Sequence, residues 1–191
     1  MNVVQMHGEP GSGKSTLARA MGQALPAIVI DKDSIASAMI RSGIDRLAAS
    51  GAAYEAMRGL AADFLRAGHS VVLDSPCYWP EIEERGRALA QEFGAGWAMV
   101  EVHCSVEQVE CRLVARAPRE GQPTNRDSVT PRQGMYSVSC ERLVLDSTRS
   151  VAEMVEEAVT YVWSLTPRPP LPLRRERGSV ESIAAQGSGL G

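Results

Sequence analysis

A glycine-rich segment near the start of the chain carries the residue types that bind nucleotide phosphates. Residues 8–15, Gly-Glu-Pro-Gly-Ser-Gly-Lys-Ser, match the pattern G-x-x-x-x-G-K-[ST] at each fixed position. Glycines let backbone N–H groups converge on phosphate oxygens at a helix N-terminus. The lysine would supply a point charge to the β- and γ-phosphates, and the serine hydroxyl would ligate magnesium. The segment is therefore predicted to be a phosphate-binding loop (P-loop).

The P-loop pattern also predicts the class of nucleotide. It differs from the G-x-G-x-x-G fingerprint of dinucleotide-binding proteins, which lacks the lysine. We therefore expect a nucleoside triphosphate, and ATP with Mg²⁺ as the cofactors because no N-K-x-D tetrapeptide that reads guanine is present. Seven residues are predicted to contact the nucleotide: Gly8, Gly11, Ser12, Gly13, Lys14, Ser15 and Thr16.

Apolar runs that alternate with helical patterns predict the elements that position this loop. Strands are predicted over residues 2–6, 27–30, 70–74, 97–102 and 143–145. Helices are predicted over residues 14–24, 34–41, about 50–67, 80–93, about 106–117, from 131 onward, and 151–165. Five strands alternating with helices imply a parallel sheet covered on both faces. The predicted fold class is a three-layer α/β/α domain.

Composition separates this domain from a tail. Residues 1–165 are expected to form the domain, with a mobile loop at about 117–130 that is polar and contains proline and arginine. Residues 166–191 are rich in proline and arginine and are expected to be disordered. The chain carries a net charge of −3. Its tail has four arginines and two glutamates, which leaves −5 for residues 1–165 and disfavours a strong grip on nucleic acid.

Other sequence features argue against a membrane or secreted protein. No run of eighteen apolar residues is present, and the first four residues lack the basic start of a secretory signal. The four cysteines show neither C-x-x-C pairs nor zinc spacing, so reduced thiols of a cytoplasmic protein are expected. The three histidines have no spacing typical of a metal site. Of the 20 basic residues, 18 are arginine, and Lys14 and Lys32 are the lysines.

Aspartates follow the ends of two predicted strands. Asp31 and Asp33 come after the second strand, and Asp74 ends the third. Ligands bind at the carboxyl ends of strands in doubly wound sheets, so these carboxylates should face the P-loop. Asp74 is placed as a Walker B aspartate that orders a magnesium shell, although it could simply form a turn before Ser75. Asp33 could alternatively cap a helix that begins at Ser34.

Arginines form a second group. Arg112 and Arg116 lie four residues apart on one predicted helical face, and Arg119 and Arg126 follow in the predicted loop. Phosphoryl transfer concentrates negative charge on the moving group, and arginines on a closing lid would neutralise that charge and exclude water. The alternative is a solvated arginine face paired with neighbouring glutamates.

The order of these features resembles the small P-loop kinases of the nucleoside, shikimate and gluconate kinase type. It looks closest to an AAA-type ATPase/kinase-like family of ATP-binding proteins that also resembles polynucleotide kinase and chloramphenicol phosphotransferase. The resemblance covers residues 2–165. Besides the P-loop it rests on Ile30–Asp33, Leu73–Pro76, Arg112 with Arg116, and Leu145–Thr148. It implies the kinase strand order 2-3-1-4-5 and an arginine-bearing lid.

The resemblance also implies roles for single residues. Asp33 would accept the proton of the acceptor hydroxyl, and Asp31 and Asp74 would hold Mg²⁺ through water beside Ser15. Lys14 and three arginines at or in the lid would act on the transferring phosphoryl group: Arg116, Arg119 and Arg126. Three further residues are expected to bind the nucleotide, the last two beside the adenine: Arg112, Asp146 and Thr148.

The expected function is therefore an ATP-dependent phosphotransferase acting on a hydroxyl of a small metabolite or antibiotic. Two alternatives are a polynucleotide 5′-hydroxyl kinase and a non-catalytic ATP-binding switch. Polynucleotide kinases carry an arginine three residues after the catalytic aspartate, where this chain has Ala36. Tyr78, Trp79 and Met39 could line an acceptor pocket or belong to the core. Neither the acceptor nor the oligomeric state can be deduced from the sequence.

Overall fold

The protein is built on a five-stranded parallel sheet. This computed structural model describes residues 1–115 and 140–166. Its strands lie in the order β2-β3-β1-β4-β5, as the resemblance implied. Their bounds are β1 Asn2–His7, β2 Ala27–Asp31, β3 Ser70–Asp74, β4 Gly96–His103 and β5 Leu143–Asp146.

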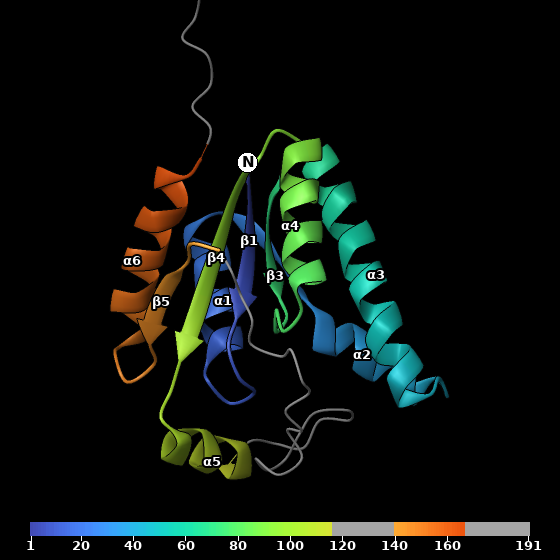
Figure 1. The fold of residues 1–191 in the computed structure, drawn as a ribbon, viewed down its shortest axis with the longest axis vertical. Coiled ribbons are helices and arrows are strands. Elements are labelled where there is room, and N and C mark those ends of the chain that lie inside the picture. Colours follow the sequence, from blue (N-terminus) through green and yellow to red (C-terminus); the bar gives the residue numbers. More distant parts are fainter. Residues whose placement is uncertain (116–139, 167–191) are drawn as a thin grey trace, which may run out of the picture.

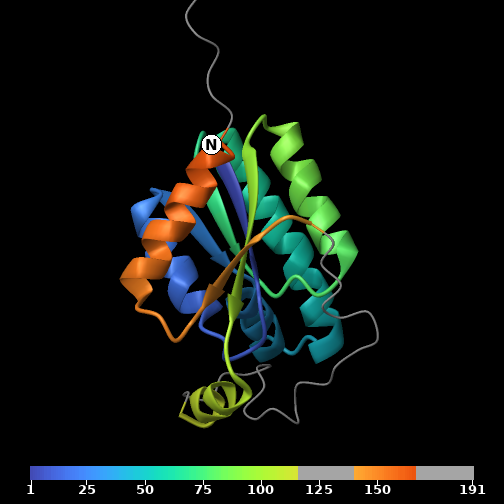
Figure 2. The same ribbon diagram turned by 60° about the vertical axis from the view of Figure 1, so that its left-hand side comes forward.

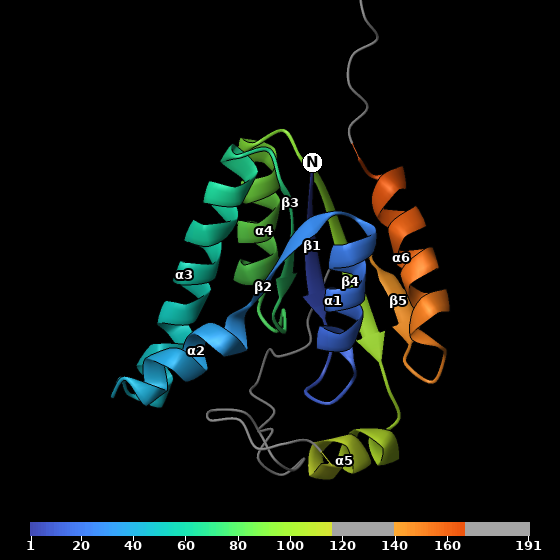
Figure 3. The ribbon, with the colours of Figure 1, turned by 180° about the vertical axis from the view of Figure 1, so that it is seen from behind.

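Helices cover both faces of this sheet, which confirms the three-layer α/β/α class. One face is covered by α1 (Lys14–Ala24) and α6 (Val151–Ser164), and the other by α3 (Arg46–Arg66) and α4 (Pro80–Glu92) (Figures 1 and 2). The short α2 (Lys32–Arg41) follows β2, and α5 (Val106–Ala115) lies beyond the carboxyl ends of the strands (Figure 3).

The central strand β1 explains why the layers hold together. All six of its residues are buried, as expected for a parallel strand with helices on both sides. Val4 and Met6 pack into the core beneath α1 and α6, whereas Val3 packs into the core beneath α3 and α4. This alternation of side chains fixes the position at which β1 delivers the P-loop.

Strand register brings polar residues together at the carboxyl edge of the sheet. Asp31 at the end of β2 is paired with Asp74 at the end of β3. On the other side of the central strand β1, His103 at the end of β4 is paired with Asp146 at the end of β5. The aspartates that follow separate strands in the sequence therefore lie at one edge.

Two helices begin earlier than the sequence pattern predicts, each because of an aspartate cap. Helix α2 begins at Lys32 because Asp31 Oδ1 accepts the N–H groups of Asp33 at 2.9 Å and Ser34 at 3.1 Å. The alternative in which Asp33 caps this helix is therefore wrong. Helix α3 begins at Arg46 rather than near residue 50, since the side chain of Asp45 caps it in the same way.

The remaining described elements agree with the predicted ones to within one or two residues. The helix predicted from residue 131 and residues 167–191 of the predicted tail lie outside the described residues.

In the described part of the chain, no helix has both the length and the apolar character needed to cross a membrane. The thiols of Cys77 and Cys104 are buried, that of Cys140 is half-buried, and that of Cys111 is exposed.

Close packing of α1 on β2 yields a stability prediction. A Cβ atom at Gly22 would lie 2.3 Å from Val29 Cγ2 and 3.2 Å from the Ala27 carbonyl oxygen. We expect Gly22→Ala to lower the free energy of unfolding by about 1–3 kcal/mol, because neither neighbour can move away cheaply. Gly59→Ala on α3 is the control: it meets no atom within 4 Å and should raise that free energy by about 0.5–1 kcal/mol. Urea denaturation measures both, and equal effects would contradict the prediction.

Candidate active site

The P-loop connects β1 to α1 through glycines in the left-handed region. Gly8, Gly11 and Gly13 have φ values of 132°, 86° and 104°. A Cβ atom at Gly8 would lie 2.5 Å from the carbonyl oxygen of Val102, so the backbone approach there requires glycine. Gly13 is the N-cap of α1 and provides no side-chain acceptor for the first turn. The geometry is that of a cradle for an anion at a helix N-terminus.

Lys14 lies folded against this loop. Its side chain is buried, and its ammonium group donates to the Glu9 carbonyl oxygen at 3.5 Å. The Ser12 N–H donates to the same oxygen at 3.1 Å, which closes the turn. The loop backbone therefore keeps the lysine charge at the mouth of the cradle, where the phosphates of a nucleotide would lie.

Asp74 is a buried carboxylate beside the first residues of α1. It is 4% exposed, and no hydrogen-bond partner of its Oδ2 atom lies among the described residues. Burial raises the pKa of Asp74, while Lys14 and Ser15 hold it down in part and the charges of Asp31 and Asp33 raise it further. A buried carboxylate with an orphan oxygen beside a hydroxyl suits a cation such as Mg²⁺, which takes one or two carboxylates and several waters.

The other two aspartates lie at the first turn of α2. Asp31 uses its carboxylate as the helix cap, and its Oδ2 atom also accepts the Ser34 hydroxyl at 2.7 Å. Asp33 lies in the first turn, with Oδ1 2.8 Å from the Lys32 ammonium nitrogen. Both charges act on Asp74. The structure thus brings together the three aspartates that the sequence placed at the site.

Lys32 was missed as a site residue by the sequence reasoning. It is 9% exposed, it pairs with Asp33, and its ammonium nitrogen lies 5.2 Å from the centre of the Tyr54 ring. Ion pairing and the cation–π contact together fix the position of the Asp33 carboxylate. One signal was available: both lysines of an arginine-rich chain directly follow predicted strand and loop ends.

Arg112 on α5 connects two loops of the site. It donates to the Ser12 carbonyl oxygen at 3.0 Å, to Ser147 Oγ at 2.8 Å and to the Ser147 carbonyl oxygen at 3.0 Å. Its planar guanidinium therefore fastens the P-loop to the loop that follows β5. This contact supplies a positioning role for Arg112, whereas direct contact with a nucleotide stays a prediction.

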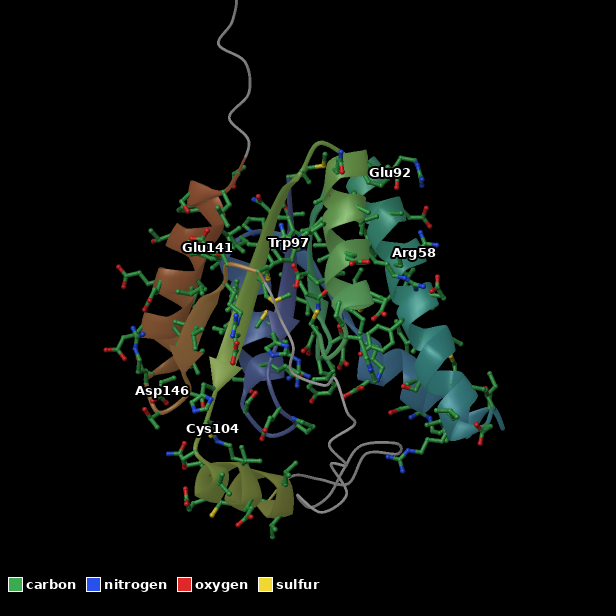
Figure 4. All side chains as sticks on the ribbon, viewed as in Figure 1. Arg58, Glu92, Trp97, Cys104, Glu141 and Asp146 are labelled. Carbon is green, nitrogen blue, oxygen red and sulfur yellow. The ribbon has the colours of Figure 1, made fainter. Side chains whose placement is uncertain are left out.

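The loop after β5 holds the residues predicted beside the adenine. Asp146 Oδ1 accepts the Thr148 N–H at 2.8 Å, and this hydrogen bond is the main cause of the lowered pKa of Asp146. Figure 4 shows Asp146 near Cys104, where β5 and β4 end. Because Ser147 is held by Arg112, this loop lies next to the P-loop.

The chain is similar in sequence to a known protein family and to a curated protein. Residues 3–137 match the family AAA_33, described as an AAA domain. The chain belongs to this AAA domain family. It is also 34% identical over 124 residues to the uncharacterized protein Rv2004c of Mycobacterium tuberculosis (strain ATCC 25618 / H37Rv). That match covers 58% of this chain and 24% of the relative, so the chain spans about a quarter of the length of that curated relative.

Solved structures show that this AAA domain has the fold of small P-loop kinases. The Mycobacterium tuberculosis APS kinase CysC, in complex with AMPPNP and APS, superposes with a TM-score of 0.63 and 20% identity, over 83% of this chain and 95% of that one. A gluconokinase from Sinorhizobium meliloti 1021 gives a TM-score of 0.58 and 19% identity, over 86% and 93% of the two chains. The predicted fold class and the predicted family resemblance are both confirmed.

Three predicted site residues of this AAA domain cannot be placed. Arg116, Arg119 and Arg126, like the predicted lid as a whole, lie outside the described residues. Their catalytic roles stay predictions.

Of the three residues considered for an acceptor pocket, Tyr78 is buried with its ring edge-on to His7, and Met39 is half-buried on α2. Trp79 lines a cavity between α3 and α4.

The raised pKa of Asp74 leads to a pH-dependent prediction. Ionised Asp74 opposes folding above its folded-state pKa, and this penalty disappears as the pH falls toward the usual value of 3.8. We therefore expect nucleotide-free Asp74→Asn to be more stable than the wild type at pH 7, with the difference shrinking on acidification. It should also lose the Mg²⁺-dependent rise in melting temperature that ADP gives the wild type.

Thermal unfolding from pH 4 to 8, with and without Mg-ADP, measures both effects. Asp63→Asn is the control, because Asp63 is exposed on α3 and pairs with Arg66. An Asp74→Asn variant that is less stable than the wild type at pH 7 would contradict the conclusion that the buried charge of Asp74 lowers the free energy of unfolding.

The contacts of Arg112 predict that it acts on the P-loop even without a nucleotide. Arg112→Lys cannot reach all three acceptors, so at least one buried carbonyl loses its partner, at about 1–3 kcal/mol in the free energy of unfolding. The variant must then restore the P-loop conformation when ADP binds. The affinity for ADP, measured by calorimetry, should fall by about tenfold for each 1.4 kcal/mol of free energy that this costs. Arg149→Lys, in an exposed ion pair with Glu157, should change neither. Lost affinity with unchanged stability would indicate direct nucleotide contact instead.

Proposed function

We propose that this AAA domain is an ATP-dependent phosphotransferase that moves the γ-phosphate of Mg-ATP to a hydroxyl of a small molecule. One observation carries the proposal: the buried Asp74 carboxylate, whose Oδ2 atom has no hydrogen-bond partner in residues 1–115 and 140–166, lies near Ser15 and Lys14 at a glycine cradle. A buried carboxylate of this kind lowers the stability of the free protein. It would be stabilised when a metal-bound triphosphate binds.

The described residues suit both Mg²⁺ and the triphosphate. Ser15 directly, and Asp74 and Asp31 through water, would hold the ion, which when bound neutralises charge on the β- and γ-phosphate oxygens. The cap does not prevent this use of Asp31, because a carboxylate has about four acceptor positions. Lys14 and the P-loop N–H groups would hold the phosphates in position, and positioning is most of what this reaction requires.

Asp33 would orient the acceptor. Its carboxylate lies at the first turn of α2, within the electrostatic range of Asp74 and held by Lys32. A hydroxyl that donates a hydrogen bond to Asp33 would lose its proton to that carboxylate as its oxygen attacks the γ-phosphorus atom, while the bond from this phosphorus to the β–γ bridging oxygen breaks and ADP leaves. Arginines of the predicted lid, Arg116 first among them, would neutralise the charge on the transferring group.

The acceptor that fits this site best is a small molecule rather than a nucleic-acid end. Ala36, at the position of the arginine that polynucleotide kinases carry, is buried in α2. The −5 charge of residues 1–165 points the same way, because phosphate contacts of a nucleic acid need cationic side chains.

The role of Asp33 separates chemistry from binding. We expect Asp33→Asn to keep the affinity for Mg-ATP and to lower acceptor-dependent turnover by about 10²–10⁴-fold, whereas Lys14→Ala should weaken both. The assay is ADP formation with sugars, nucleosides, aminoglycosides, phenicols, polyols and 5′-hydroxyl oligonucleotides as acceptors. Asp63→Asn, which alters an exposed aspartate of α3, is the matched control. Tight ATP binding with no acceptor-dependent turnover would favour a nucleotide switch and count against a phosphotransferase.

A further inference from the structure

A cavity of about 450 Å³ lies between α3 and α4, above the sheet face that both helices cover. Figure 4 labels Arg58 on α3, the helix that runs beside α4. The lining of the cavity is mainly apolar. It includes six large aliphatic or indole side chains: Leu47, Met57, Leu73, Trp79, Ile82 and Leu89. The volume lies within the range of about 300–1,000 Å³ typical of small-molecule sites.

Small residues keep this space open. The two helices hardly contact each other, and each presents a glycine to the cavity, Gly51 on α3 and Gly86 on α4. Gly51 is exposed at the rim of the cavity, and a Cβ atom there would meet no atom within 4 Å, so a larger side chain has room at this position. At Gly86, by contrast, a Cβ atom would lie 3.1 Å from Trp97 Nε1, so α4 is packed tightly on the sheet there.

Charged side chains surround the opening of the cavity. Glu55 on α3 forms ion pairs with Arg85 on α4 and with Arg58 one turn along its own helix. These ion pairs are half exposed to solvent. Because exposed pairs of this kind contribute little, they can open for a ligand at small cost. The cavity therefore combines an apolar interior with a polar rim.

Tyr54 connects the cavity to the carboxylates of the active site. Its ring lines the cavity, and its hydroxyl donates to the Pro76 carbonyl oxygen at 2.9 Å. The Lys32 ammonium that pairs with Asp33 lies 5.2 Å from the centre of the same ring. A further lining residue, Leu73, directly precedes Asp74. The cavity and the proposed phosphoryl-transfer site are thus neighbours across one aromatic ring.

We propose that this cavity binds the apolar body of the phosphoryl acceptor, and this proposal rests on the proposed function. The acceptor class is an alcohol whose body is an aromatic or aliphatic ring system, with its hydroxyl directed past Tyr54 toward Asp33. Burying such a body is favourable at about 25 cal/mol per Å² of apolar surface. A sugar or polyol would instead leave hydroxyls without partners against leucine and methionine side chains, which disfavours its binding.

Gly51 allows the cavity to be filled without disturbing the fold. Gly51→Leu places a side chain into open space, and leucine is a better helix former than glycine. Gly59→Leu is the matched control: Gly59 lies on the same helix, also meets no atom within 4 Å, and is not part of the cavity lining. Both variants should fold at least as stably as the wild type.

The test uses calorimetry with Mg-AMPPNP present, followed by ADP formation with Mg-ATP. The compounds are 1-naphthalenemethanol, cyclohexylmethanol and a phenicol on one side, and glucose and sorbitol on the other. We expect the ring alcohols to bind the wild type and Gly59→Leu, and Gly51→Leu to weaken that binding by about tenfold or more, equal to about 1.4 kcal/mol. AMPPNP affinity should be the same in all three proteins, and KM for a productive ring alcohol should rise in Gly51→Leu.

Several outcomes would overturn the proposal. Turnover of glucose or sorbitol that Gly51→Leu leaves unchanged would reject the cavity as the acceptor site while leaving the phosphotransferase intact. Absence of binding by every ring alcohol to the wild type would also reject it. Ring alcohols that bind in a Gly51-dependent way but never accept phosphate would show a ligand site that is not the acceptor site, and would count against the phosphotransferase as well.

Discussion

The buried charge of Asp74 is the constraint on which the rest of the site depends. Asp74 ends a strand that is flanked by β1 and β2, so its carboxylate has little access to water. A charge in such a place is costly unless other groups stabilise it. Lys14 and Ser15 supply part of that stabilisation, whereas Asp31 and Asp33 add negative charge. The low solvent access of this carboxylate is the reason that we propose a divalent cation at this place.

Placement of Lys14 in turn depends on two loops and the end of strand β4 at the carboxyl edge of the sheet. Glycines with positive φ values let the P-loop pass close to the Val102 carbonyl on β4. Arg112 fastens the same loop, through the Ser12 carbonyl, to the segment after β5. The backbone course of the P-loop and the Arg112 hydrogen bond to it thus determine where the lysine and serine lie.

Most of the fold could be predicted because its elements are short and strongly patterned, and the strand order came from the kinase resemblance. The P-loop was readable because its chemistry needs particular residues at consecutive positions. The cap of α2 was not, since Asp31 and Asp33 are equally good capping residues and strand pairing with Asp74 decides between them. The contacts of Arg112 were equally hidden, because they join residues 100 and 35 positions apart in the chain.

The acceptor half of the site differs in kind from the nucleotide half. Nucleotide binding depends on backbone N–H groups and a few invariant chemical roles, so it leaves a local pattern in the sequence. The cavity between α3 and α4 depends instead on the distance between two helices and on the absence of a side chain at Gly51. A helix rich in alanine and glycine can cover a sheet tightly on one side and still leave space on another. Acceptor choice can therefore change through single small-to-large substitutions on α3, while Asp74, Lys14 and the P-loop stay as they are.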